Sequence, residues 1–445
     1  MSKNEKMISG DTIVAQATPF GHSGVALVRV SGQDSLKIVE KLTGGSPLKN
    51  RVSTFSKILS PNNDVIDQAL ITYFHAPASY TGENVVEITP HGNPAIVENI
   101  IETICIYGGR IADPGEFTKR AFINGKLDLI QVEAVAALIN SKSKESALAQ
   151  QKIASGDLSK KINDIKGILV STLALVENEI DISEELMGEQ TVANVKTNLM
   201  KTGDLIGGLL ETYKLGKMLF EGLDVIIAGE TNVGKSTLFN ALVKKDVSIV
   251  NQEPGTTRNL IEAELLIGGA VIRVVDTAGA RKTKNPVEKE GLDRAKKRSK
   301  KADLVLHLTD DPAKAMTIKK TRKTLIVLTK SDLRKNVGEK NNIIHISAKT
   351  GLGMDALLDK IKKSLGTTGL STDTTYLSTL RQKRALSLCG KPLERAISSV
   401  GLDPVDLSTL AFDIREALNQ IDSILGKTTA DEILNTIFTS FCVGK

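Results

Sequence analysis

The sequence predicts a multidomain α/β plus α protein, with an N-terminal α+β domain, a helical domain, and an inserted α/β domain whose sheet is mostly parallel with flanking helices. Three changes of pattern predict this fold class. Residues 11–126 mix short apolar runs with Gly/Pro turns, and helical spacing begins at Leu127. Residues 223–365 alternate β-branched runs with helical stretches, and helical spacing returns after Thr372. Because the helical pattern resumes after the sheet pattern, the simplest architecture is an insertion.

Length and composition are those of a globular protein. A chain of 445 residues has room for about three domains. Hydrophobic residues make up 41% and charged residues 25%, which is ordinary. There is no apolar run long enough to span a membrane, and the start MSKNEKMISGDT resembles neither a signal peptide nor a transit peptide. We therefore expect a cytoplasmic protein with no membrane partner.

Charge and side-chain chemistry narrow the classes of partner. Three cysteines and five histidines are scattered, and they predict neither a disulfide framework nor a zinc site. A net charge of +6 is compatible with an RNA partner. Aromatic residues are only 3% with no Trp, so we do not expect bases to stack on an aromatic platform.

Four apolar runs between turns predict the strands of the N-terminal domain: TIVAQA, GVALVRV, QALITYF and NVVEIT. In the helical region that follows, one face is formed by Ile130, Ala134, Ala137 and Leu138. We place the domains at 1–126 (N-terminal), 127–220 and 369–445 (the two parts of the helical domain) and 221–368 (the inserted domain).

The end of the chain predicts two further helices. The first ends at Gly426 and carries an apolar stripe formed by Ile414, Leu418, Ile421 and Leu425. Thr429 and Glu432 form a capping box for the second, which carries Ile433, Ile437 and Phe441.

The strongest motif is GETNVGKS, Gly229 to Ser236, which follows the strand-like run VIIA and opens the helix-like run TLFNAL. This is a P-loop in its expected context of strand, loop and helix. The glycines let backbone N–H groups surround phosphates, Lys235 can reach the β- and γ-phosphates, and Ser236 can offer its hydroxyl to Mg²⁺.

Later motifs predict guanine as the base. VIRVVDTAG ends a strand with Asp276, the expected second Mg²⁺ contact, and with Gly279, whose N–H can bond the γ-phosphate. In LIVLTKSD, Asp332 would accept from guanine N1 and N2, and in HISAK the N–H of Ala348 would meet the guanine oxygen. These motifs predict GTP rather than ATP. Thr329 stands where GTPases usually have Asn, and this shorter partner predicts weaker base affinity.

The residues that catalyse hydrolysis are less evident. In PGTTR, Thr257 is the expected switch residue that closes over Mg²⁺ and the γ-phosphate, the alternative being an ordinary turn. Ala280 occupies the place where Ras has its water-orienting glutamine. The cation-rich segment after it, RKTKNPVEKEGLDRAKKRSKK, contains Glu288, and it also fits a solvated switch helix.

The tail FCVGK, Phe441 to Lys445, has two interpretations. Cys442 occupies the cysteine place of a C-a-a-X lipidation box, although Lys is not among the usual last residues and neither a polybasic run nor a second cysteine lies just upstream. The alternative is an active-site element.

Seven segments together resemble the MnmE (TrmE) family of tRNA-modifying GTPases, within the TrmE-Era-EngA-like P-loop group. They are DTIVAQATPFGHSGVALVRVSG, YTGENVVEITPHG, DPGEFTKRAFINGKLDL, NVGKSTLFNAL, PGTTR, DTAG and the C-terminal FCVGK. The resemblance runs along nearly the whole chain. It implies a Ras-like G domain inserted into the helical domain and an N-terminal domain that binds folate and forms a homodimer.

The resemblance also implies a reaction. With the flavoprotein MnmG, which supplies FAD, the family adds an aminomethyl or carboxymethylaminomethyl group to C5 of the wobble uridine in certain tRNAs. The reaction uses GTP, glycine or ammonium, and a one-carbon unit from 5-formyl- or 5,10-methylene-tetrahydrofolate.

By position, the implied folate contacts are Arg29, Glu87, Lys126 and Lys445. A carboxylate suits the amino-pyrimidine edge of the pterin and cations suit the glutamate carboxylates, but without the family each residue also fits a surface charge. Cys442 is either a chemical group near the folate, with its thiolate favoured by Lys445, or a small residue that closes the last helix turn.

The family depends on K⁺, which balances the charge of the leaving phosphoryl group. Here the implied K⁺ ligands are the side chains of Asn232 and Thr256 and the carbonyls of Asn251 and Glu253. Glu288 maps to the residue that orients water, so the implied catalytic residues are Glu288, Lys235 and Cys442, with Ser236 and Thr257 on Mg²⁺. The full set of expected GTP contacts is Asn232, Val233, Gly234, Lys235, Ser236, Thr237, Asn251, Thr256, Thr257, Asp276, Thr277, Ala278, Gly279, Thr329, Lys330, Asp332, Ser347, Ala348 and Lys349.

Thr231, Asn259 and Ala280 replace the usual Pro, Asp and Leu of the family. The first two border the nucleotide and switch loops, which predicts slower hydrolysis. Two other hypotheses stay open. One alternative is a regulatory GTPase of ribosome assembly, but such proteins typically append a KH-type module, and a GXXG loop in a matching context is not evident. The other is a folate-binding structural partner with a degenerate GTPase, motivated by Thr329 and Ala280.

Overall fold

The computed structural model describes residues 10–182, 188–244, 261–276, 302–318, 321, 323–334, 343–367, 373–402, 405–428, 431–439, 441 and 444. The chain forms two compact units, each assembled from segments that lie far apart in the sequence. The first contains Met1–Ala136, Ser159–Lys196 and Leu388–Lys445, and the second contains Ala137–Leu158 and Thr197–Ser387.

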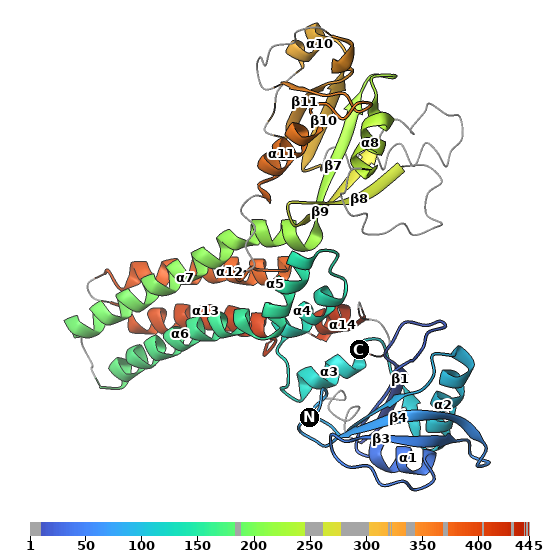
Figure 1. Cartoon of the computed structure of the whole chain (residues 1–445). Helices are drawn as coiled ribbons and strands as arrows, with labels where there is room; N and C mark the ends of the chain where they lie inside the picture. The colour runs from blue at the N-terminus through green and yellow to red at the C-terminus, as the bar shows by residue number, and fades with distance from the viewer. Residues whose placement is uncertain are drawn as a thin grey trace. The chain divides into compact units, whose positions relative to one another are not determined.

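A six-stranded sheet of order β3-β4-β5-β2-β1-β6 lies in the first unit (Figure 1). Its strands are β1 (Thr12–Gln16), β2 (Val28–Ser31), β3 (Ser53–Leu59), β4 (Val65–Phe74), β5 (Val85–Thr89) and β6 (Gly109–Ile111). Neighbouring strands are antiparallel except for β1 and β6. Arg29 on β2 pairs directly with Glu87 on β5. Cross-strand partners lie close enough to interact, so this register brings together two of the expected site residues.

The two faces of this sheet have different covers. Helices α1 (Ser35–Leu42) and α2 (Pro94–Ile106) share a core with one face, formed by residues that include Val28, Val30, Val39, Ile88 and Ile100. Helix α3 (Glu116–Ile123) covers the other face, where Phe117 packs with Ile13 and Ala15. Side chains alternate along a strand, so Arg29, between Val28 and Val30, faces α3.

Further described helices lie between residues 129 and 221 and after residue 379. They are α4 (Leu129–Ile139), α5 (Lys144–Ala154), α6 (Asp157–Ile182), α7 (Glu189–Glu221), α12 (Leu380–Ser399), α13 (Leu407–Leu425) and α14 (Asp431–Thr439). The predicted end of α13 is confirmed, because Gly426 caps it with a left-handed φ of 91°. The predicted capping box of α14 lies outside the described residues, since Thr429 and the side chain of Glu432 are not described.

Helix α14 packs in the first unit through aromatic side chains. Phe438 and Phe441 are buried and share a core with Leu129 and Val132. A Cβ added to Gly115, just before α3, would lie 2.4 Å from the carbonyl oxygen of Phe438. Only a glycine therefore allows α14 to approach the start of α3 this closely.

The second unit contains the other six-stranded sheet, of order β12-β11-β10-β7-β9-β8. Its strands are β7 (Leu223–Gly229), β8 (Ile261–Ile267), β9 (Ala270–Asp276), β10 (Leu304–Thr309), β11 (Thr324–Leu328) and β12 (Ile343–His345). All neighbouring pairs are parallel except β8 and β9. The predicted mostly parallel sheet is therefore confirmed, and it is interposed between α7 and α12 in the sequence.

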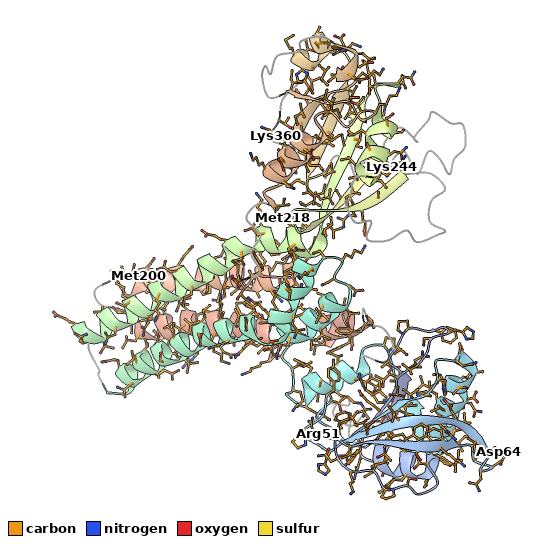
Figure 2. The ribbon with its side chains drawn as sticks, in the orientation of Figure 1. Arg51, Asp64, Met200, Met218, Lys244 and Lys360 are labelled. Atoms are coloured by element: carbon orange, nitrogen blue, oxygen red, sulfur yellow. The ribbon has the colours of Figure 1, made fainter. Side chains whose placement is uncertain are left out.

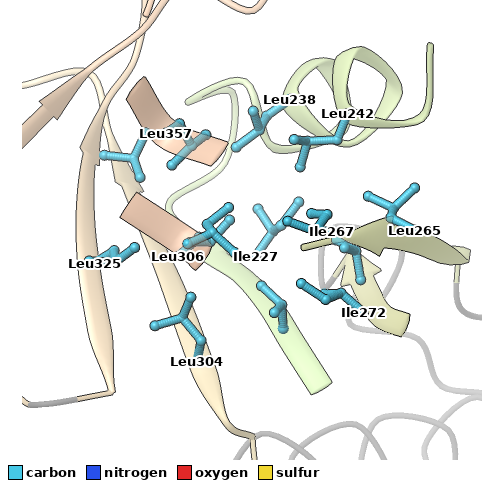
Figure 3. Close-up of a cluster of buried hydrophobic side chains, with 14 of the residues drawn as sticks. Ile227, Leu238, Leu242, Leu265, Ile267, Ile272, Leu304, Leu306, Leu325 and Leu357 are labelled. Carbon is cyan, nitrogen blue, oxygen red and sulfur yellow. The ribbon is translucent and has the colours of Figure 1, made fainter. Parts of the chain in front are cut away.

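Helices flank this sheet: α8 (Lys235–Lys244), α10 (Pro312–Thr317) and α11 (Met354–Leu365), with a short 3-10 helix, η2, at Ser331–Leu333. Figure 3 shows the core, in which Leu238 of α8 and Leu357 of α11 pack with strand residues that include Ile227 and Leu306. Parallel strands buried by helices read as continuous apolar runs, which explains VIIA and LIVL in the sequence.

A tight turn joins α7 to β7. Met218, near the end of α7 and labelled in Figure 2, is buried in the same core. Gly222 has a left-handed φ of 74°, and a Cβ there would lie 2.6 Å from the carbonyl oxygen of Val271. The helix thus leads directly into the strand that carries the P-loop. Within the part of the chain that is described, every helix is too short or too polar to cross a membrane.

Candidate functional site

The P-loop, Gly229–Ser236, lies between the end of β7 and the start of α8. Asn232 and Gly234 have left-handed φ values of 63° and 95°, which turn the chain back on itself. A Cβ on Gly229 would lie 2.3 Å from the carbonyl oxygen of Leu308, so strand β10 passes against this glycine. The glycines therefore have two roles, a left-handed turn and a close approach.

Lys235 points into the loop that it follows. The residue is 7% exposed, and its Nζ donates to the carbonyls of Gly229 at 3.0 Å and Glu230 at 2.6 Å. An ammonium group has three hydrogens that rotate, so the same group can be offered to phosphate oxygens. The side chains of Asn232, Ser236 and Thr237 are exposed around it.

Thr329 connects the end of β11 to the P-loop. The residue is 4% exposed, and its Oγ1 lies 2.6 Å from the carbonyl oxygen of Val233 and 3.3 Å from that of Thr309. The sequence indicated only that Thr is shorter than the usual Asn. The structure adds that the hydroxyl holds together two loops that are 96 residues apart in sequence.

The two loops expected to bind the base lie side by side. The backbone N–H of Ser331 donates to Ile346 at 3.1 Å, and that of Ile346 donates to Leu328 at 2.9 Å. Asp332 is exposed on η2, so its carboxylate can accept hydrogen bonds from a ligand. The buried Ser347 is followed by Ala348 and Lys349, and one residue, Ile346, separates them from β12.

Lys330 shapes the same edge of the sheet. It has a left-handed φ of 56°, and its Nζ lies 2.7 Å from an Asp310 carboxylate oxygen. The hydrogen bond from Lys330 lowers the pKa of Asp310, outweighing the opposite effect of burial. The carboxylate therefore stays ionised beside the expected base.

Several expected residues lie outside the described residues: Asn251, Glu253, Thr256, Thr257, Asn259, Thr277, Ala278, Gly279, Ala280, Glu288, Cys442 and Lys445. For Asp276, only the backbone is described. It is the last residue of β9 and lies opposite Ile227 of β7. The strand that ends at the expected Mg²⁺ residue thus runs beside the strand that enters the P-loop.

A second polar site, here called the Arg29 cluster, consists of Arg29, Tyr80, Glu87, Phe117 and Gly444. Arg29 donates to Oε1 of Glu87 from Nε at 3.0 Å and from Nη2 at 2.8 Å. Its Nη1 donates to the carbonyl of Gly444 at 3.4 Å, a contact between residues 415 apart in sequence. Gly444 therefore lies beside the expected Arg29–Glu87 pair.

Aromatic rings hold the guanidinium of Arg29 in place. Its Cζ lies 5.3 Å from the ring centroid of Tyr80 and 5.8 Å from that of Phe117, within the range of cation–π attraction. The Tyr80 hydroxyl lies 2.8 Å from that of Thr118. Burial raises the pKa of Tyr80, against smaller lowering effects of Thr118 and Arg29, so the phenol keeps its proton.

Lys126 is exposed, and its Nζ donates to the carbonyl of Pro77 at 3.0 Å. Its stem also lies close to Gly82, where an added Cβ would be 3.2 Å from its Cγ. The side chain of Lys126 thus lies against the loop that carries Tyr80, whereas Arg29 and Glu87 lie on strands β2 and β5. Sequence reasoning missed Tyr80 and Phe117, although both lie within motifs that carried the resemblance, YTGENVV and DPGEFTKR.

An ionic network centred on the buried Arg120 holds α3. Arg120 is 1% exposed and pairs with Asp11 at 2.7 Å, Glu83 at 3.1 Å and Glu116 at 3.0 Å. Arg110 also pairs with Asp11 and Glu116, at 2.6 Å each. Helix α3 carries Phe117, so the network supports this member of the Arg29 cluster. Helix α3 also lies against α14, the last helix before Gly444 in the sequence.

Two family models match the chain. The model described as the GTP-binding protein TrmE N-terminus matches residues 12–126, and the model described as the MnmE helical domain matches residues 129–442.

Curated relatives match along nearly the full length. The tRNA modification GTPase MnmE of Aquifex aeolicus (strain VF5) is 38% identical over 449 residues, covering 98% of this chain and 100% of the relative. The MnmE of Francisella philomiragia is 38% identical over 458 residues, covering 99% and 100%. Among solved structures, the G domain of the T. maritima FeoB iron transporter is 24% identical with a TM-score of 0.25, covering 32% of this chain and 98% of that chain.

Proposed function

Because the chain belongs to the MnmE family of tRNA modification GTPases, we propose that it is a K⁺-dependent GTP hydrolase that works with MnmG on the wobble uridine of certain tRNAs. GTP binding, GTP hydrolysis and a role in tRNA modification follow from the family. The partner, the cations and the folate chemistry are the further steps of the proposal. The observation that carries the folate part of the proposal is the contact of Gly444 with Arg29.

In the proposed GTP site, the backbone of Asn232–Thr237 surrounds the phosphates and Lys235 neutralises the β- and γ-oxygens. The left-handed φ values of Asn232 and Gly234 support this role, because such turns can gather backbone N–H groups into an anion-binding concavity. Thr277, Ala278 and Gly279 would contact the γ-phosphate. Glu288 would orient the attacking water, and Asp332 would accept from guanine N1 and N2.

The proposal includes two cations at the nucleotide site. Ser236 and Thr257, with Asp276, are proposed to hold Mg²⁺, which would bridge phosphate oxygens. The side chains of Asn232 and Thr256 and the carbonyls of Asn251 and Glu253 are proposed to hold K⁺, which would balance charge where other GTPases use an arginine. The exposed position of the Asn232 side chain is compatible with this role.

The Arg29 cluster is the proposed folate site. The two hydrogen bonds from Arg29 to Glu87 both end on Oε1. The Oε2 atom of Glu87 can therefore accept from the amino-pyrimidine edge of a pterin. Lys126 and Lys445 would pair with the glutamate carboxylates, and the tail would bring Cys442 to the same place. The bound tetrahydrofolate would supply the one-carbon unit.

The proposed assembly is a homodimer through the N-terminal domain that binds MnmG, with FAD on the partner, and acts on tRNA in the cytoplasm. The proposed product carries an aminomethyl or carboxymethylaminomethyl group at C5. The proposed domains are the N-terminal domain at 1–126, the inserted GTPase domain at 221–368, and the helical domain in two parts at 127–220 and 369–445.

The test is GTP turnover by the full chain in K⁺ and in Na⁺ at equal ionic strength. We expect turnover at least about tenfold faster in K⁺, with that advantage lost in Asn232→Ala and all turnover impaired in Glu288→Ala. Asn240→Ala, an exposed asparagine further along α8, is the matched control and should keep the K⁺ advantage. Equal turnover in the two salts would refute the K⁺ site.

A further inference from the structure

The hydroxyl of Thr329 has two carbonyl neighbours but only one hydrogen. Its Oγ1 lies 2.6 Å from the oxygen of Val233 and 3.3 Å from that of Thr309. A threonine hydroxyl can donate one hydrogen bond at a time. The hydrogen therefore has to be assigned to one of the two carbonyls.

The surroundings assign it to Val233. The carbonyl of Thr309 already accepts from the backbone N–H of Thr329 at 2.9 Å. The bond to Val233 is also the shorter one, and Thr329 is 4% exposed. Water cannot easily replace a buried hydroxyl, so moving the hydrogen away would weaken the connection between the β11 end and the P-loop.

The hydrogen bond from Thr329 to Val233 limits what this hydroxyl can offer to a guanine base. With Asp332 on N1 and N2 and Ala348 on O6, as proposed above, the next polar atom around guanine is N7, which is an acceptor. Thr329 contacts the P-loop through its hydrogen bond to Val233. Its hydrogen is already engaged with Val233, and its oxygen can offer N7 only lone pairs. An asparagine amide in the same place would have two hydrogens, one for each acceptor.

We propose that Thr329 secures the P-loop through Val233 and does not donate to N7 of guanine. The ligand class is therefore guanine nucleotides whether or not position 7 is a nitrogen. This inference rests on the proposed base contacts of Asp332 and Ala348.

The test compares the dissociation constants of GDP and 7-deaza-GDP, in which a C–H replaces N7, for the full chain with Mg²⁺ by calorimetry. For the natural chain we expect the two constants to agree within about twofold. In Thr329→Asn we expect GDP to bind about tenfold more tightly than 7-deaza-GDP, because a neutral hydrogen bond has that net effect. The matched control Thr317→Asn, on the exposed end of α10, should keep the natural ratio.

A third variant tests the link from the Thr329 hydroxyl to the P-loop by itself. Thr329→Val keeps the shape but removes the hydrogen, so both nucleotides should bind more weakly by the same factor, with their ratio unchanged. This result is independent of whether Thr329→Asn folds.

The outcomes are distinguishable. A tenfold preference of the natural chain for GDP would overturn this inference alone, as would a Thr329→Asn variant that folds and gains no preference. Failure of the natural chain to bind either nucleotide would overturn the proposed nucleotide site together with it.

Discussion

The P-loop draws its groups from consecutive residues, Gly229 to Ser236, whereas the Arg29 cluster draws its members from β2, β5, α3 and the end of the chain. The P-loop offers its backbone together with the side chains of Asn232, Lys235 and Ser236. The Arg29 cluster is made of side chains that hold one another, with an arginine between two aromatic rings and a carboxylate. A contiguous site depends on local conformation, and a distributed site depends on the packing of the elements that carry it.

The first prediction breaks the P-loop alone. Lys235→Ala removes the ammonium that lies over the Gly229 and Glu230 carbonyls. We expect GTP turnover to fall about 100- to 1000-fold, because a preorganised group that stabilises developing charge has effects of that size. Folate binding should be unchanged. Single-turnover hydrolysis and folate calorimetry on the same sample measure both.

The control for this variant is Lys244→Ala, at the other end of α8 and labelled in Figure 2. It should retain turnover within about twofold, since an exposed lysine has little effect on its surroundings. A Lys235→Ala protein that hydrolyses GTP normally would show that the loop backbone alone suffices.

The second prediction breaks the support of the Arg29 cluster. Arg120→Met leaves Asp11 and Glu116 with Arg110 as their remaining ionic partner, and it leaves Glu83 with the hydroxyl of Ser31. Removing one member of a buried network leaves uncompensated charge, and we expect the local free energy of unfolding to fall by about 3 kcal/mol. Hydrogen exchange should become faster in α3 and β2, with β7 unaffected.

The control is Lys37→Ala, which removes an exposed pair with Asp34 at 3.1 Å and should leave exchange nearly unchanged. If exchange in α3 stays slow in Arg120→Met, then the hydrophobic packing of Phe117 holds the helix by itself.

The same contrast explains what the sequence could and could not predict. The P-loop, the strand that enters it and the mostly parallel sheet were predicted because glycine spacing and apolar runs act over a few residues. The link from Thr329 to Val233 was missed because it spans 96 residues and depends on how two loops pack.

The Arg29 cluster shows the limit more sharply. The resemblance named Arg29 and Glu87, and in the structure their side chains are hydrogen-bonded. The residues that hold them, Tyr80, Phe117 and Arg120, carry no spacing signal. An aromatic or a charged residue in a turn or a short helix has many other uses, and only the folded structure shows which one applies.

The third prediction tests the tail. Gly444 has a left-handed φ of 97°, and a Cβ there would lie 2.2 Å from the carbonyl oxygen of Gln16. Gly444→Ala should displace the tail and weaken folate binding by about tenfold, as the loss of one or two hydrogen bonds would, with GTP hydrolysis unchanged. Deleting Phe441–Lys445 should abolish tRNA modification and also spare hydrolysis.

The matched control is Gly24→Ala, a glycine with open space around its Cα and an ordinary φ. It should leave folate affinity unchanged. If the deletion variant still modifies tRNA, the tail has no part in the folate site, and the contact of Gly444 with Arg29 is only structural.

The smallest expected effect is a pH dependence that sharpens the distinction between packing and charge. Burial alone would raise the pKa of Glu116, but hydrogen bonds from Arg110, from the backbone of Asp113 and from Arg120 outweigh it and hold the pKa below its usual range. A carboxyl group with a lowered pKa stabilises the fold above the unfolded value of about 4.3, and this contribution is lost as the pH falls through the folded value. The exchange protection of α3 should therefore fall below about pH 4.5.

Glu116→Gln isolates this contribution, because the amide has nearly the same shape and does not titrate in this range. We expect the variant to be less protected than the natural chain at pH 7 and the difference to shrink on acidification. Other carboxylates with lowered pKa values, such as Asp67, titrate in both proteins and cancel in the comparison. A difference that stays constant from pH 7 to about pH 3 would mean that Glu116 stabilises α3 through its hydrogen-bond geometry and not through its charge. The Arg29 cluster would then depend, like the P-loop, on how its groups are placed more than on how they are ionised.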